Sequence, residues 1–389
     1  GCADSSCVGT SSTTTWRPWV VPFAMLTLLA SLIMAPTLSV DAVAADSARS
    51  ERAKGGKKAP RAQSGSAPEF GVQFHGTWGD YNDASRATVL ETLGDNGVST
   101  VRIDVSWRML QPSGPGEFDA WGVRQVDAAI DAAMARGLRP LVTLWMAPEW
   151  ATGSSDERVP PSTPSALSAW KGFAQAMVER YGARVDAWEI WNEPNHDDFM
   201  RGASPTTYAQ VLRWAHAGIK GADPTATVVF GGTQYVDVSW IKKVLAAGGT
   251  TYDVMAVHPY QGVADEAPEL PDNGTMYRLG RVPALYALMR KEGHASRPIW
   301  FTEFGWRASP KLAGAPHWKR GVTPKRQAAF LIRTLTHVAS TMPFVERVYW
   351  YTDRADSASA KKAGYGLVFP NGSPTRALRA AGSYLSASR

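Results

Sequence analysis

From residue 70 to the end of the chain, short apolar runs that favour β-strands alternate with longer segments of helical periodicity. The strand-like runs cover residues 70–74, 98–105, 138–145, 185–190, 226–230, 252–257, 298–302 and 345–351. The helical patterns cover residues 83–94, 121–136, 163–181, 204–220, 238–247, 276–292, 323–341 and 374–386. Strands that are separated by helices must run parallel, because hairpins cannot join them, and helices must cover them. Eight such units in about 320 residues predict a (β/α)8 TIM barrel over residues 70–389.

Local signals mark several of these helices. Thr163-Pro164, Ser204-Pro205 and Thr323-Pro324 each place a capping hydroxyl before a first-turn proline. The pattern over 276–292 contains Pro283, which leaves a break in that helix open.

An open, doubly wound sheet would show the same alternation of strands and helices. Such folds carry a glycine-rich phosphate loop after the first strand. Here the sequence at that point is His75-Gly76-Thr77-Trp78. The closed barrel is therefore the favoured prediction.

Residues 1–45 have the pattern of a secretory leader. Arg17 precedes an apolar run over residues 19–40, which Pro22 and Pro36 interrupt, and Ala42-Val43-Ala44 matches a small-x-small cleavage site. We expect a cleaved signal and a secreted protein. The alternative is an uncleaved membrane tether through residues 19–40 with the barrel outside, because about 20 apolar residues can span a bilayer.

Residues 46–69 predict a disordered basic linker, since serine, alanine, glycine and charged residues cannot bury enough apolar surface. This segment holds six basic and three acidic residues, half of the chain's net charge of +6. No basic stripe interleaved with aromatic residues suggests a nucleic-acid partner. Both cysteines, Cys2 and Cys7, precede the predicted barrel, which must therefore fold by core burial without disulfides, and we expect a monomer.

In a TIM barrel the reactive residues lie where the strands end and in the loops that follow. These positions are rich here in polar and aromatic residues: His75, Trp78, Arg102, Asp104, Trp107, Trp145, Trp150, Asn192, Glu193, Gln234, Tyr235, His258, Tyr260, Glu303, Trp306, Trp350 and Asp353. Flat aromatic rings suit the apolar faces of sugars, and the chain has 16 tryptophans. The pattern predicts a mouth that binds carbohydrate.

Two of these positions are glutamates at the ends of different strands. The segment WEIWNEPN (188–195) presents Asn192 and Glu193 together at the end of the fourth predicted strand. Pro194 predicts an extended backbone at Glu193. Glu303, in TEFGW (302–306), ends the seventh strand. On opposite walls of a barrel, the two carboxyls would face one another across a bound sugar.

Such a pair predicts a retaining glycosidase, in which the two carboxyls lie about 5–5.5 Å apart. Glu193 would be the acid/base, with a raised pKa, and Glu303 the nucleophile. We expect hydrogen bonds from Tyr260 and Arg102 to keep Glu303 ionised. Asn192 would hold the sugar's 2-hydroxyl.

Further residues are expected to line the substrate site. They are His75, His258, Trp145, Trp306 and Trp350, the last as a platform for a sugar ring. Asp104 and Asp353 stay open between a site role and a structural role. No metal or cofactor is expected, because the seven histidines show no HExxH or HxH spacing.

The chain resembles the clan A glycoside hydrolases, above all the cellulase-like family 5 and family 39. The likeness covers residues 70–389 and rests on NEP (192–194), HPY (258–260), TEFGW (302–306) and Trp350. Family 39 includes β-xylosidases, α-iduronidases and bacterial endoglycosidases that cleave exopolysaccharides. The leader and the segment GLVFPNGSPTRAL, ending at Leu378, make the last type the most similar.

The resemblance implies an acid/base at Glu193, a nucleophile at Glu303 and substrate-site roles at Arg102, Asn192, His258, Tyr260 and Trp350. Many cellulase-like members carry a histidine at the end of the third strand, where this chain has Trp145-Met146-Ala147-Pro148. That departure disfavours plain cellulase activity. The expected function is thus a secreted hydrolase of β-glycosidic bonds in a polysaccharide or oligosaccharide. A non-catalytic, cell-surface polysaccharide-binding protein and a membrane-tethered hydrolase remain the alternatives.

Overall fold

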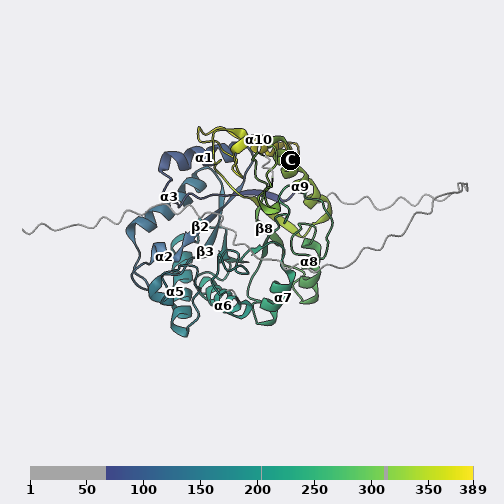
Figure 1. The fold of residues 1–389 in the computed structure, drawn as a ribbon. Coiled ribbons are helices and arrows are strands. Elements are labelled where there is room, and N and C mark those ends of the chain that lie inside the picture. The colour runs from purple at the N-terminus through teal and green to yellow at the C-terminus, as the bar shows by residue number, and fades with distance from the viewer. Residues whose placement is uncertain (1–66, 203, 311–313, 389) are drawn as a thin grey trace, which may run out of the picture. The chain divides into compact units, whose positions relative to one another are not determined.

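The computed structural model describes residues 67–202, 204–310 and 314–388, which form a barrel of parallel strands inside a ring of helices (Figure 1). The predicted leader, and the predicted linker up to residue 66, lie outside the described residues. The first strand begins at Glu69, one residue before its predicted start. Among the described helices, none is both long enough and apolar enough to cross a membrane.

The described residues contain nine strands. They are β1 (Glu69–Gln73), β2 (Thr100–Ser106), β3 (Arg139–Trp145), β4 (Ala187–Ile190), β5 (Thr227–Phe230), β6 (Thr233–Gln234), β7 (Met255–His258), β8 (Ile299–Phe304) and β9 (Val345–Trp350). All neighbouring strands pair in parallel, in the order β5-β4-β3-β2-β1-β9-β8-β7-β6. A parallel bridge between Val229 and Val254 joins β5 to the chain leading into β7. The barrel is therefore closed, as predicted.

The ninth strand is β6, a short strand that follows the predicted fifth strand after Gly231 and Gly232. A Cβ on Gly231 would lie 2.4 Å from the carbonyl oxygen of Ile190, and one on Gly232 would lie 2.3 Å from Nε2 of His258. Only glycine allows such close approach of a backbone to its neighbours. β5 and β6 are thus two halves of one barrel position.

Ten α-helices and two 3-10 turns surround the strands in the described residues. They are α1 (Asp83–Asp95), α2 (Trp107–Leu110), α3 (Ala120–Ala135), α4 (Glu149–Thr152), α5 (Pro164–Tyr181), α6 (Pro205–Ala222), α7 (Val238–Ala246), α8 (Val282–Lys291), η1 (His317–Lys319), α9 (Pro324–Thr341), η2 (Ala360–Lys362) and α10 (Arg376–Ala387). α10 lies between α1 and α9, so the last helix completes the ring beside the first (Figure 1). Thr163, Ser204 and Thr323 cap α5, α6 and α9 as predicted, each accepting a hydrogen bond from a first-turn N–H.

The helix predicted over residues 276–292 is shorter than expected. It begins at Val282, with Pro283 in its first turn, so the proline starts the helix instead of breaking it. The preceding residues form a turn in which Gly280 approaches Leu270, whose carbonyl oxygen would lie 2.4 Å from an added Cβ. This contact with a distant loop overrides the helical pattern of residues 276–281.

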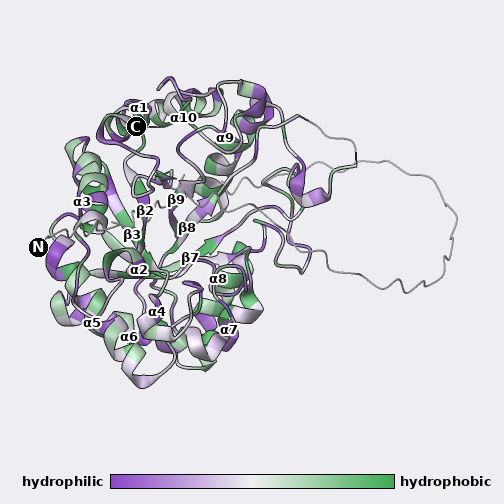
Figure 2. Ribbon diagram, turned by 60° about the vertical axis from the view of Figure 1, so that its left-hand side comes forward, coloured by the Kyte–Doolittle hydropathy of each residue, from purple (hydrophilic) through white to green (hydrophobic). Residues whose placement is uncertain are grey.

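Inside the barrel, side chains form an apolar layer with a polar layer beyond it. The apolar layer consists of Leu141, Ala187, Val229, Val254, Ala256, Trp300 and Tyr349. Moving two residues along a strand keeps the same face, and this step leads from Leu141 to Thr143, from Ala187 to Glu189 and from Ala256 to His258. Figure 2 shows the strands as mainly hydrophobic, with hydrophilic stretches on the surrounding helices and loops. The polar layer therefore lies toward the C-terminal ends of the strands.

The base of the barrel offers a test of this packing. A Cβ on Gly71 would lie 2.4 Å from the Tyr349 ring and 2.8 Å from Cγ2 of Thr100. We expect Gly71→Ala to lower the free energy of unfolding by about 1–3 kcal/mol, the usual cost of overpacking, measured by urea denaturation. Gly172→Ala in α5, where no atom lies within 4 Å of the added Cβ, should instead raise it by about 0.5–1 kcal/mol. Equal stabilities for the two variants would contradict this account of the interior.

Candidate active site

A buried guanidinium occupies the centre of the polar layer. Arg102 of β2 is 1% exposed. It donates from Nε to Glu189 Oε2 at 2.6 Å and from Nη1 to Glu303 Oε1 at 2.8 Å. It also donates from Nη1 to Gln73 Oε1 at 2.6 Å and from Nη2 to Asn192 Oδ1 at 2.8 Å. One cation thus connects strands β1, β2, β4 and β8.

Strand register explains why these groups meet. Gln73 and Arg102 are paired residues on β1 and β2, and paired residues of parallel strands face the same side of the sheet. Burial lowers the pKa of Arg102, but the carboxylates of Glu189 and Glu303 more than offset this effect and raise it. The guanidinium therefore stays charged, because an ionic partner replaces the water that burial removes.

Glu189 is a member of this layer that sequence reasoning did not single out. Its side chain is fully buried, and it accepts hydrogen bonds from Arg102, from Thr143 Oγ1 at 2.6 Å and from the backbone N–H of Gly232 at 3.0 Å. A charged residue inside a short apolar strand was the available signal, since such a residue requires a partner when buried. Glu189 holds Arg102 in place from β4.

Glu303 lies at the end of β8, between two donors. Tyr260 Oη donates to Oε2 at 2.9 Å and Arg102 donates to Oε1, the two hydrogen bonds that the sequence predicted. Burial raises the pKa of Glu303 to about 6, against the lowering effect of Arg102 and of the Tyr260 hydrogen bond. At neutral pH this carboxyl is mainly ionised.

Glu193 has a different environment. Its Oε1 lies 2.9 Å from Nδ1 of His258, and its Oε2 accepts from Gln234 Nε2 at 3.1 Å. Burial, and next the charge of Glu303, raise the pKa of Glu193 well above its ordinary value. No arginine contacts this carboxyl among the described residues, so Glu193 is the protonated member of the pair.

The backbone at Glu193 corrects one prediction. Its φ is +41°, in the left-handed region, and not the extended conformation that Pro194 was expected to impose. Its N–H donates to the carbonyl oxygen of Gly232 at 3.0 Å, and its carboxyl is held by His258. These contacts outweigh the local preference, a cost of order 1–3 kcal/mol that occurs mainly at functional sites.

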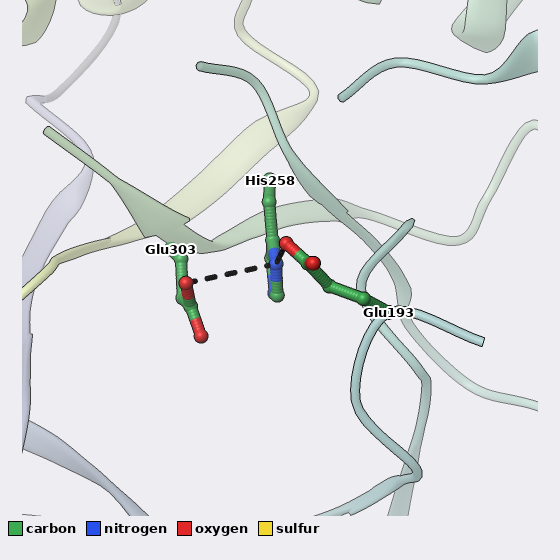
Figure 3. A group of neighbouring side chains, drawn as sticks. All are labelled: Glu193, His258 and Glu303. Atoms are coloured by element: carbon green, nitrogen blue, oxygen red, sulfur yellow. Dashed lines mark hydrogen bonds and ion pairs between the residues drawn. The ribbon is translucent and has the colours of Figure 1, made fainter. Parts of the chain in front are cut away.

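His258, at the end of β7, lies between the two glutamates (Figure 3). One oxygen of each glutamate and one ring nitrogen of His258 all lie within 4.8 Å of one another. Burial, followed by the charge of Arg102, lowers the pKa of His258 well below its ordinary value. The imidazole is therefore neutral, with Nε2 hydrogen-bonded to Thr302 Oγ1 at 3.1 Å.

The same three atoms have a spacing that could hold a metal ion. Two observations favour the acid pair instead. Glu193 and His258 are already hydrogen-bonded to each other, and the Arg102 guanidinium lies 2.8 Å from Glu303. A second cation beside Glu303 would be repelled by the first.

Asn192 and His75 lie in this region as predicted. Arg102 occupies Oδ1 of Asn192, which leaves the amide Nδ2 without a hydrogen-bond partner among the described residues. His75, after β1, is 8% exposed, and Thr352 Oγ1 lies 2.9 Å from its Nδ1. Asn192 can therefore donate to a ligand, whereas His75 is mainly held by protein groups.

The three predicted tryptophans are buried, among them Trp350, the predicted platform for a sugar ring. Trp350 has no exposed surface, packs against Phe304 and Trp306, and donates from Nε1 to the carbonyl oxygen of Tyr365 at 2.7 Å. Trp306 is 3% exposed and Trp145 is 9% exposed. Stacking on a sugar requires an exposed ring face, so Trp350 is not a platform in this structure, and substrate contacts of Trp145 and Trp306 stay predictions. The buried Nε1 of Trp145 has no hydrogen-bond partner in the part of the chain that the structure describes.

Exposed rings do occur beside the site, at other positions. Trp78 is 41% exposed and packs against the His75 ring at a tilt of 36°, with 3.9 Å between the ring centroids. Tyr277 is 49% exposed and meets Tyr235 edge-on at 4.9 Å. Trp78 is one of the rim residues picked out from the sequence, while Tyr277 lies in residues 276–281, which the sequence pattern assigned to a helix and which precede α8 in the structure.

Comparison with known families agrees with this geometry. Residues 62–330 match the model of the cellulase family, described as glycosyl hydrolase family 5. A β-xylosidase of Caldicellulosiruptor saccharolyticus is 24% identical over 277 residues, which cover 66% of this chain and 54% of the relative. Beta-glucosidase 34 of Oryza sativa subsp. japonica is 27% identical over 150 residues, covering 34% of this chain and 28% of the relative. The chain thus spans between about a quarter and a half of these relatives.

Solved structures share the barrel. A family 39 glycoside hydrolase from Bacteroides cellulosilyticus WH2 has a TM-score of 0.64 at 24% identity, covering 82% of this chain and 64% of that one. GH5_18 from Streptomyces cattleya, solved with GlcNAc, has a TM-score of 0.62 at 20% identity, covering 84% and 81%. At these identities the likeness establishes the fold.

The raised pKa of Glu193 predicts a pH-dependent penalty on stability. Folded Glu193 keeps its proton above pH 4.5, where a glutamate in the unfolded chain loses it, so the free energy of unfolding falls as pH rises. Glu193→Gln should match the wild type near pH 4 and become the more stable protein toward pH 8, by about 1.4 kcal/mol for each unit of raised pKa. Urea denaturation across this pH range measures the difference. Gly172→Ala, which changes no titratable group, should differ from the wild type by a constant amount. A constant difference for Glu193→Gln would contradict the assignment.

Proposed function

The chain belongs to the cellulase family, glycosyl hydrolase family 5, and from that premise we propose that it is a retaining glycoside hydrolase acting on β-glycosidic bonds in a polysaccharide or oligosaccharide. One observation carries the proposal. Oxygens of Glu193 and Glu303 lie within 4.8 Å of each other, close to the spacing of about 5–5.5 Å typical of retaining enzymes and short of the roughly 6.5–9.5 Å of inverting ones.

The different environments of the two acids assign their roles. In the first step Glu303 attacks the anomeric carbon, while Glu193 gives its proton to the departing glycosidic oxygen. The carbon–oxygen bond breaks as the bond to Glu303 forms, which leaves a glycosyl ester and an ionised Glu193. In the second step Glu193 takes a proton from water, whose oxygen attacks the same carbon and releases Glu303. Both carboxyls return to their starting states.

The surrounding hydrogen bonds fit these steps. Arg102 and Tyr260 each donate one hydrogen bond to a different oxygen of Glu303, so that each oxygen keeps a lone pair free for attack on the sugar. The free Nδ2 of Asn192 is placed to donate to a sugar hydroxyl, a contact that strengthens in the transition state. Loss of the Glu303 charge in the ester removes one cause of the raised pKa of Glu193, which favours its change from acid to base.

The substrate class follows from the family and its relatives. The curated relatives are called β-xylosidase and β-glucosidase, which supports β-linked neutral sugars as substrates. The predicted leader supports an enzyme exported from the cell and acting on an external glycan. A purely sugar-binding role would need neither a protonated nor an ionised glutamate at this spacing.

Substitution of each acid should have a distinct effect on hydrolysis. Glu303→Gln should lower kcat by on the order of 1,000-fold or more for every substrate, because no nucleophile remains. Glu193→Ala should lower it by about 100- to 10,000-fold for alkyl leaving groups and much less for 2,4-dinitrophenyl β-glycosides, which leave without a proton. Sodium azide should accelerate Glu193→Ala by attacking the ester, and it should not rescue Glu303→Gln.

The control for these assays is Glu346→Gln. Glu346 is exposed at the N-terminal end of β9, on the side of the barrel opposite the C-terminal strand ends, so this variant should keep wild-type activity. Near-normal hydrolysis by Glu303→Gln would remove the assignment of the nucleophile. Equal losses on both kinds of leaving group would remove that of Glu193.

A further inference from the structure

A second carboxylate faces the mouth beside Glu303. Asp104 lies two residues after Arg102 on β2, so its side chain points to the same inner face, one step closer to the C-terminal end of the strand. Its side chain is 13% exposed, whereas that of Arg102 is 1% exposed. Asp104 is therefore the point at which this strand meets solvent inside the barrel.

The two oxygens of Asp104 differ. Oδ2 accepts from Gln73 Nε2 at 2.7 Å and lies 4.0 Å from Nε2 of His75. Oδ1 has no donor within hydrogen-bonding distance in the described part of the chain. A carboxylate oxygen that faces the solvent inside the barrel mouth and has no partner among the described residues is placed to accept from a ligand.

Asp353 is the other carboxylate beside His75, and protein groups already use its capacity to accept hydrogen bonds. It is 1% exposed, and its two oxygens are filled by protein donors. Those donors are the hydroxyl groups of Tyr81 and Thr352 and the backbone N–H groups of His75 and Arg354. Asp353 therefore has a structural role, and the contrast identifies Asp104 as the carboxylate open to substrate.

We propose that Asp104 is a specificity-determining residue, which accepts a hydrogen bond from a hydroxyl or ammonium group of the sugar unit bound next to Glu303 and disfavours a sugar carboxylate there. The proposal rests on the function proposed above and narrows its substrate class. The site should take neutral or amino sugars and reject uronic acids.

The charges around Asp104 support this preference for neutral or amino sugars over uronic acids. The guanidinium of Arg102 is already shared between Glu189 and Glu303. Two arginines of the neighbouring loops are also paired, Arg354 with Asp80 and Arg307 with Asp356. A sugar carboxylate placed here would lie near Glu303 and Asp104, while each of these three described arginines already has a carboxylate partner. Like charges brought together in this way oppose binding.

Aromatic rings lie around His75 and Asp104. The exposed ring of Trp78 packs at a tilt against His75, and Tyr351 meets His75 edge-on with 5.6 Å between the ring centroids. Glu303 and Asp104 both raise the pKa of the Tyr351 hydroxyl, after the larger effect of burial, which places this ring near both acids. Flat rings can pack against the apolar face of a sugar while Asp104 binds its polar edge.

The test compares matched tetrasaccharides binding to the Glu193→Gln protein, which keeps the charge of Glu303. The probes are β-1,4-mannotetraose and the β-1,4-mannuronate tetramer, which differ only in a hydroxymethyl group against a carboxylate, and cellotetraose and the chitosan tetramer, which differ in a hydroxyl against an ammonium group. Affinities are measured by calorimetry. We expect mannotetraose to bind at least about ten-fold more tightly than the mannuronate tetramer, and the chitosan tetramer to bind no more weakly than cellotetraose.

Adding Asp104→Asn keeps the shape and the acceptor for Gln73 but removes the charge. The ratio between mannotetraose and the mannuronate tetramer should then fall by at least about ten-fold, mainly through tighter binding of the uronate. Asp353→Asn is the matched control, and it should lower the melting temperature while leaving the ratio unchanged. A purely structural Asp104 would behave like Asp353.

An unchanged ratio in Asp104→Asn would overturn the proposal, as would tighter binding of the uronate to the Glu193→Gln protein or no binding of any tetramer at millimolar concentration. Release of reducing ends by the wild-type protein is assayed separately on the tetramers that bind. A protein that binds with the expected selectivity and cleaves nothing would refute the hydrolase and leave the role of Asp104 in sugar binding standing.

Discussion

The ion pairing of one buried guanidinium is the interaction on which the rest of the site depends. Arg102 is out of contact with water, and an unpaired charge in that position would cost several kcal/mol. Its partners Gln73, Glu189, Asn192 and Glu303 come from three other strands or their ends, so satisfying this charge also fixes the relative positions of those strands. The apolar layer beneath supplies the low-dielectric floor that makes each of these contacts strong.

Arg102 contacts only one of the two candidate catalytic glutamates, and this difference separates their roles. The guanidinium touches Glu303 and not Glu193, whose neighbours are a neutral histidine and an amide. Two carboxyls this close cannot both be ionised without strong repulsion, so the one with the cation carries the charge. The division into acid and nucleophile thus follows from which strand ends the arginine can reach, and Asp104 adds a further negative charge on the side of Glu303.

The sequence was sufficient for the barrel, the three proline-capped helices and the pairing of Glu193 with Glu303, because period, caps and strand ends are local patterns. It was insufficient where distant segments meet. The break between β5 and β6 at Gly231 and Gly232 depends on close approach to β4 and β7, and the late start of α8 depends on the contact of Gly280 with the loop at Leu270. Likewise Trp350 is buried because the chain near Tyr365 covers its indole N–H. Glu189 was overlooked because its partner lies 87 residues away in the chain.

The most direct measurement of the central claim is the configuration of the sugar that is released first. Proton NMR of the anomeric signals, recorded in the first minutes of hydrolysis of a β-linked oligosaccharide, separates the initial product from later mutarotation. Two acids within 4.8 Å, one ionised and one protonated, predict that the β-anomer appears first and the α-anomer follows slowly. Initial release of the α-anomer would mean a single displacement by water and would contradict the account.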